Sequence, residues 1–175
     1  MKTNPLEPVW KAFQISVKCF EMTHEIIRQK KTNFLKNSDW LLVPNIQQEI
    51  IQTKQESNDL FVVRLWTTFE DFIIRYLQDK GTVLQQHIIP TALANPVYEQ
   101  FKREVKQWKT DDMLNLLKEI PSIDKNLIEQ ARSIFQYQNW IIDGKDINKV
   151  STVRAVSTTD SYHILNKIIS FLLLN

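Results

Sequence analysis

The stretch that decides the fold is FVVRLWTTFEDFIIRYL, residues 61–77. Its apolar residues recur at steps of three and four, which places them on one broad face of a helix. They are Phe61, Leu65, Phe69, Phe72, Ile73, Tyr76 and Leu77. Asn58 or Asp59 is a suitable residue to cap the start of this helix, and Gly81 is a suitable residue to end it. The spacing therefore predicts a long amphipathic helix from Asp59 to about Gly81.

The same helical spacing continues through most of the chain, with no alternating pattern that would indicate a strand. Further helix starts are predicted at Pro8, Pro96, Asp111 or Asp112, Ser122 and Ser157. Val83 to Ile89 forms a short additional candidate that Pro90 ends, and residues 145–157 are polar and aperiodic, as in a loop. We expect an all-α protein: a single domain over residues 1–175, built as an antiparallel bundle of about five to seven helices.

Composition excludes several classes of site. Two glycines cannot form a glycine-rich phosphate loop, and one cysteine excludes an internal disulfide and paired-cysteine zinc sites. The three histidines lie far apart in the sequence, so we expect no metal site and no cofactor. A net charge of +2 is too mild to indicate a dedicated nucleic-acid binder. The lone thiol, the lack of a signal-peptide pattern and the lack of a membrane-spanning stretch predict a cytoplasmic protein without a membrane partner.

A second informative stretch is YQNWIIDGKD, residues 137–146, inside the penultimate predicted helix. It resembles the signature of HEPN domains, helical bundles typical of prokaryotic toxin and defence systems. In the branch it most resembles, that signature reads Tyr-Arg-Asn-Trp, two apolar residues, and then His-Gly-Lys or His-Gly-Arg. The sequence WTTFEDF at residues 66–72 is similar to a Phe-Glu-x-Phe pattern of the same proteins. The resemblance covers residues 60–80 and 127–172.

The resemblance implies a metal-free ribonuclease reaction in which the RNA 2′-hydroxyl attacks and a cyclic phosphate remains. The family's arginine holds the phosphate and its histidine moves a proton, but here these positions are Gln138 and Asp143, beside Asn139. Glutamine carries no charge for the phosphate, and an aspartate, ionised at neutral pH, is a poor proton shuttle. We therefore expect no catalytic residues. If the family geometry survives, Gln138→Arg together with Asp143→His should restore weak cleavage.

The predicted motif helix also carries a polar stripe made of Arg132, Gln136, Asn139 and Asp143. Steps of four, three and four place these residues on one face, which the family resemblance associates with a dimer seam. One interpretation is a solvated or dimer-facing stripe, and the other is a repurposed groove in which Arg132 or Lys145 binds phosphate. Glu70 is a candidate partner for Arg132, with an exposed carboxylate as the alternative.

A basic ridge formed by Lys102, Arg103, Lys106 and Lys109 lies beside Phe101 and Trp108. It could neutralise a nucleic-acid backbone while an aromatic side chain stacks on a base. However, Phe101 and Trp108 are one heptad apart, which is more typical of core residues, so a solvated face is the favoured interpretation.

These observations lead to one preferred function and two alternatives. We expect a catalytically degenerate HEPN-like interaction or regulatory module in a prokaryotic defence or toxin–antitoxin system. The alternatives are a metal-independent endoribonuclease with a rearranged active site and, more weakly, an RNA- or DNA-binding adaptor. The expected partner is a second copy of the chain or a related helical protein, with RNA as a further candidate.

Overall fold

The computed structural model describes residues 3–29, 44–145 and 155–174, and these residues form an all-α helical bundle. Its α-helices are α1 (Glu7–Arg28), α2 (Ile46–Gln85), α3 (Ala94–Glu104), α4 (Thr110–Lys118), α5 (Lys125–Ile142) and α6 (Thr158–Leu174). Short 3-10 turns, Thr91–Leu93 and Val105–Gln107, flank α3. The described ranges contain no strand, which confirms the predicted fold class.

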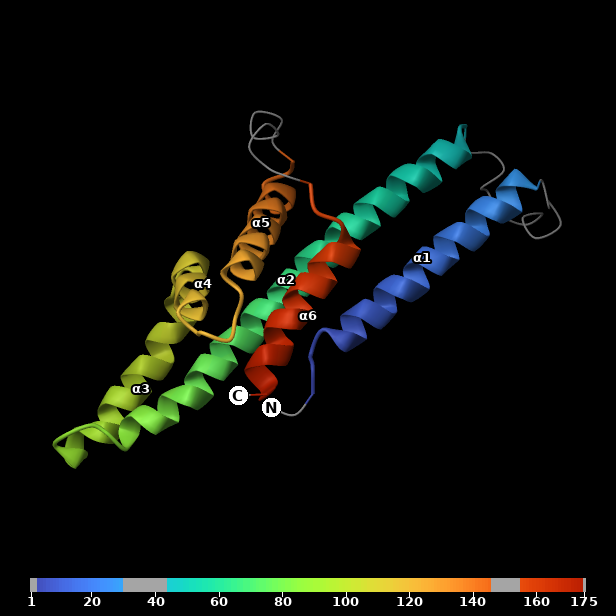
Figure 1. The fold of residues 1–175 in the computed structure, drawn as a ribbon. Coiled ribbons are helices and arrows are strands. Elements are labelled where there is room, and N and C mark those ends of the chain that lie inside the picture. The colour runs from blue at the N-terminus through green and yellow to red at the C-terminus, as the bar shows by residue number, and fades with distance from the viewer. Residues whose placement is uncertain (1–2, 30–43, 146–154, 175) are drawn as a thin grey trace.

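Helix α2 is the axis of the bundle (Figure 1). Its 40 residues span about 60 Å, at 1.5 Å per residue. Helix α1 runs antiparallel along the N-terminal half of α2, and α3 folds back along the C-terminal end (Figure 1). Helices α5 and α6 pack on the middle of α2, and α4 packs on α5. The N-terminal half of α2 and its partner α1 therefore project from the bundle as a two-helix arm.

The hydrophobic core lies where α2 meets α5 and α6. Phe69 and Phe72 of α2 are buried there, as the 61–77 stripe predicts, and so is Trp66, which the stripe did not include. Ile134 of α5 and Ile168 of α6 are completely buried in the same cluster. Each buried aliphatic or aromatic side chain stabilises the folded state by about 1.5–3 kcal/mol, so this cluster fixes how α5 and α6 are placed on α2.

The start of α2 corrects one prediction. The helix begins at Ile46, so neither Asn58 nor Asp59 is a helix cap. Residues 46–58 are rich in glutamine, glutamate and isoleucine and contain no proline or glycine, so nothing interrupts the helix before the apolar stripe. Asp59 is buried in the helix interior, with 4% of its surface exposed.

The end of α2 corrects a second prediction, because the helix passes through Gly81 and ends at Gln85. A Cβ at position 81 would overlap the ring of Phe101, so this glycine permits close packing of α3 rather than ending the helix. Val83 to Ile89 is accordingly not a separate helix: its first residues complete α2 and the rest form the turn before Pro90.

The other helix ends agree with the sequence to differing degrees. Ser157 caps α6 as predicted: its Oγ accepts a hydrogen bond from the Asp160 backbone N–H at 3.0 Å and donates to the Asp160 carboxylate. Asp124, not Ser122, caps α5 by accepting from the Asn126 backbone N–H at 2.9 Å. Helix α4 starts at Thr110, immediately before the predicted Asp111 or Asp112 cap. Of the predicted 145–157 loop, residues 146–154 lie outside the described residues.

Candidate functional site

The motif helix ends in a turn that points its last lysine back toward α2. The Gly144 N–H bonds to the Ile141 carbonyl at 3.1 Å and the Lys145 N–H to the Trp140 carbonyl at 2.8 Å. These two bonds are the Schellman pattern of helix termination, and Gly144 has the left-handed φ of 76° that the pattern requires. Lys145 is also left-handed, with φ 59°.

A buried carboxylate on α2 receives this lysine. Lys145 Nζ lies 2.8 Å from Asp59 Oδ2, and the Tyr137 hydroxyl donates to Asp59 Oδ1 at 2.8 Å. The Gln55 amide also donates to Oδ1, at 3.2 Å. We call Asp59, Tyr137 and Lys145 the clamp. Burial raises the pKa of Tyr137, and the hydrogen bond to Asp59 raises it further. The Tyr137 hydroxyl therefore keeps its proton and donates its hydrogen bond to the carboxylate of the clamp.

The two degenerate motif positions lie in different environments. Gln138 is 7% exposed and its Oε1 has no hydrogen-bond partner among the described residues, whereas Asp143 is exposed. A phosphate-binding group at position 138 and a proton-transfer group at position 143 would therefore not reach the same solvent-accessible space.

Arg132, the candidate replacement cation, faces α4 and is surrounded by acceptors. Its guanidinium forms ion pairs with Asp111 and, at 3.4 Å, with Glu129, and donates to Asn115 at 2.9 Å. The proposed pairing of Arg132 with Glu70 is wrong, and so is the alternative of an exposed carboxylate, because Glu70 is half-buried. Glu70 instead accepts a hydrogen bond from the Thr110 hydroxyl at 2.6 Å, because the start of α4 lies between the two helices.

The remaining residues of the predicted seam lie on the outer side of α5. Gln136, Asn139 and Asp143 are exposed, while Trp140 is half-buried and stacks on Tyr137 with ring centroids 5.6 Å apart. This face is polar and accessible in the single chain. The seam itself remains a prediction.

The basic ridge is only partly available to a nucleic acid. Lys106 and Lys109 are exposed, but Lys102 pairs with Glu99 at 3.2 Å and Arg103 donates to Gln100 at 2.7 Å. Phe101 and Trp108 meet edge to face at 5.8 Å and pack against the core. Both aromatic side chains are therefore partly buried against the core, which favours the solvated-face interpretation of the ridge over a stacking platform.

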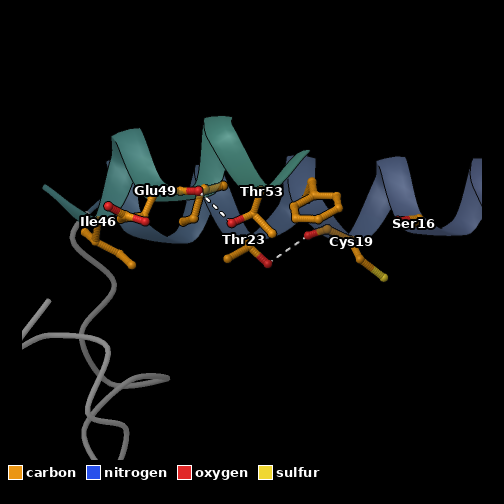
Figure 2. Close-up of a pocket in the computed structure, with 8 residues that line it drawn as sticks. Ser16, Cys19, Thr23, Ile46, Glu49 and Thr53 are labelled. Carbon is orange, nitrogen blue, oxygen red and sulfur yellow. Dashed lines mark hydrogen bonds between the residues drawn. The ribbon is translucent and has the colours of Figure 1, made fainter. Parts of the chain in front are cut away.

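Sequence reasoning missed a groove on the arm between α1 and α2 (Figure 2). It has a volume of about 500 Å³ and is lined by Ser16, Cys19, Phe20, Thr23, Ile46, Glu49, Ile50 and Thr53. A second, more polar groove of about 470 Å³ lies between α5 and α6 and contains His163 and Lys167. Each groove forms only where two helices pack together, so the periodicity of one helix could not reveal it.

The described residues contain no group of three or more side chains that could hold a metal ion. None of the described helices is long and apolar enough to cross a bilayer. Comparison of the chain with models of protein families, with curated proteins and with solved structures gives no significant match.

Proposed function

We propose that the chain is a catalytically inactive HEPN-like interaction or regulatory module, acting in a prokaryotic defence or toxin–antitoxin system. The observation that carries the proposal is that the two candidate phosphate-binding cations, Arg132 and Lys145, are already paired with carboxylates of the same chain. Lys145 is bound in the clamp to Asp59, and Arg132 is held by Asp111 and Glu129. A cation engaged in this way must give up its partners before it can bind a phosphate.

The two replaced positions support the same proposal. Gln138 is buried and uncharged, so it supplies neither the charge nor the access that a phosphate requires. Asp143 adds negative charge at the exposed end of the motif helix, where it repels an RNA backbone. The motif residues Tyr137 and Lys145 then serve to hold α5 on α2.

We further propose that the polar face of α5 contacts a second copy of the chain or a related helical protein. The contact would use Arg132, Gln136, Asn139 and Asp143. In a symmetric contact the same patch appears on both partners. Polar interface rims of this kind contribute mainly specificity, since exposed hydrogen bonds and charges add little net affinity.

Metal-free RNA cleavage tests the proposal. Purified protein in a chelator should leave single-stranded RNA intact, and so should the Gln138→Arg/Asp143→His variant, because position 138 is buried. Arg132→Ala is compared with Lys125→Ala, which removes an exposed lysine of the same helix. Cleavage by the unmodified protein that Arg132→Ala abolishes and Lys125→Ala retains would contradict the proposal and support the rearranged ribonuclease.

A further inference from the structure

The arm groove has an apolar floor with few free polar groups. Thr23 Oγ1 donates to the Cys19 carbonyl and Thr53 Oγ1 to the Glu49 carbonyl, each at 2.8 Å (Figure 2). Both hydroxyls are therefore satisfied within their own helices and need no polar ligand. Phe20, Ile46 and Ile50 provide the larger apolar surfaces of the groove. An occupant of this groove must therefore be largely apolar.

Beside the groove, α1 carries an exposed apolar ridge made of Ile15, Cys19 and Met22. Ile15 is 64% exposed and Met22 is 66% exposed, and Cys19 between them is a free, exposed cysteine. Steps of four and three place the three side chains on one face of the helix. Helix α1 therefore contributes both one wall of a groove and an adjacent ridge of matching apolar character.

Charges of opposite sign accompany the ridge and the groove. Lys11 and Lys18, one heptad apart, precede Ile15 and Met22 by one helical turn each. Glu49 and Glu56, also one heptad apart, follow the outer edge of α2 on the groove side. Within the described part of the chain, these four side chains form no ion pair with one another or with other residues. The ridge is thus flanked by positive charge and the groove by negative charge.

We infer that the groove is filled by the ridge of a second copy of the chain, and that the second copy receives the ridge of the first in return. The ridge extends from Ile15 to Met22 and the α1 wall of the groove from Ser16 to Thr23, so both are centred near Cys19. Two α1 helices crossing antiparallel about a two-fold axis near Cys19 bring each ridge to the other groove. The same arrangement brings the lysines of each copy toward the glutamates of the other.

The proposed contact is small. The ridge covers about two turns of helix, or about 11 Å of its length, so it buries less surface than a standard interface, which buries about 800 Å² per partner. We therefore expect a weak dimer, with a dissociation constant of about 1–40 µM, which corresponds to about −6 to −8 kcal/mol. The contact uses no residue of α5, so an experiment can support or contradict it independently of the dimer seam proposed on α5.

Cross-linking through the native cysteine tests the inference, because the chain has one cysteine. A short bis-maleimide should join two copies through Cys19 in proportion to protein concentration between about 5 and 200 µM, and light scattering should show the same dimer. Cys19→Ser should abolish the cross-link while the dimer mass remains. Ile15→Asp with Met22→Asp should weaken dimerisation at least about tenfold, because charge would enter an apolar contact.

Two further comparisons separate this contact from others. Lys11→Glu with Lys18→Glu should weaken the dimer, and adding Glu49→Lys with Glu56→Lys should restore it. Val83→Asp, at an exposed apolar site near the end of α2, serves as the matched control and should change nothing. A monomeric mass at every concentration would overturn the inference. So would a dimer that survives the Ile15/Met22 change and is lost with Asn139→Arg; that result would assign the dimer to the seam on α5.

Discussion

The two halves of α2 have the same backbone conformation but different surroundings. From Ile46 to Asn58 the helix lies mainly against α1, and Ile50 is its one buried residue; α6 reaches this half only at its end, where the Thr158 hydroxyl donates to the Asn58 carbonyl at 3.0 Å. From Asp59 onward the same helix is covered by α5, α6 and α3, and most of its apolar stripe is buried. Continuous helical structure therefore does not imply uniform stability along the helix.

The two halves also differ in what surrounds their charges. In the core half, Asp59 is buried and its carboxylate is held by the clamp. In the arm, Glu21 of α1 and Lys54 of α2 form an ion pair at 4.0 Å, with the Glu21 side chain 62% exposed. The core half uses its charges to hold helices together, whereas the arm leaves its surface available to a partner.

The largest expected effect comes from breaking the clamp. Lys145→Ala leaves the Asp59 carboxylate buried without its cation, and should lower the free energy of unfolding by about 2–3 kcal/mol. Chemical denaturation measures this loss, with Lys125→Ala, an exposed lysine at the start of α5, as the control. Asp59→Asn with Lys145→Gln should recover much of the loss. A loss below about 0.5 kcal/mol for Lys145→Ala would show that the clamp is not a stabilising element.

The next effect depends on pH. Burial, and next the hydrogen bond to Glu7, raise the pKa of Tyr162 to about 12. Below pH 10 the tyrosine is protonated in both the folded and the unfolded chain; between about pH 10 and 12 the unfolded chain loses the proton first. This residue should therefore remove about 2 kcal/mol of stability as the pH rises through that window.

Tyr162→Phe isolates that contribution. The decline in unfolding free energy above pH 10 should become shallower in Tyr162→Phe and keep its slope in Tyr98→Phe, which changes a tyrosine of α3. If the unfolding free energy fell equally steeply above pH 10 in the unmodified protein and in Tyr162→Phe, the hydrogen bond from Tyr162 of α6 to Glu7 of α1 would not cause the pH dependence.

A smaller effect is expected where α3 packs on α2. Gly81→Ala places a methyl group against the Phe101 ring, at a cost of about 1–3 kcal/mol, while alanine regains about 1 kcal/mol of helix propensity. The net loss should be about 1 kcal/mol by thermal or chemical denaturation. In a Phe101→Leu background the same change should be neutral or stabilising. A destabilisation that persists there would place its cause elsewhere than at the ring.

The smallest effect is expected in the arm. Removing the exposed ion pair by Glu21→Gln should change the free energy of unfolding by less than about 0.5 kcal/mol, because both charges remain solvated. Chemical denaturation of Glu21→Gln and Lys145→Ala under the same conditions measures the difference between the two halves of α2. Similar losses from the two variants would contradict the distinction between a buried and an exposed pair.

Sequence reasoning predicted the helices and caps that depend on residues close in the sequence. It missed the contacts between side chains that are far apart in the sequence. The 61–77 stripe and the Ser157 cap follow from local spacing, and both are confirmed. Asp59 resembled a helix cap because aspartate is common at that position. Its actual partner, Lys145, is 86 positions away, and only the packing of α5 on α2 brings the two together. Likewise, the acceptors around Arg132 include two from α4, whose position against α5 no periodicity specifies.

The central claim is that the motif residues stabilise the fold instead of cleaving RNA, and Lys145 tests it most directly. Unfolding free energy and metal-free RNA hydrolysis should be measured together on the unmodified protein, Lys145→Gln and Asp59→Asn. We predict that both single variants lose stability and that none of the three proteins hydrolyses RNA. Hydrolysis by the unmodified protein that disappears in Lys145→Gln, with the free energy of unfolding unchanged, would contradict the claim.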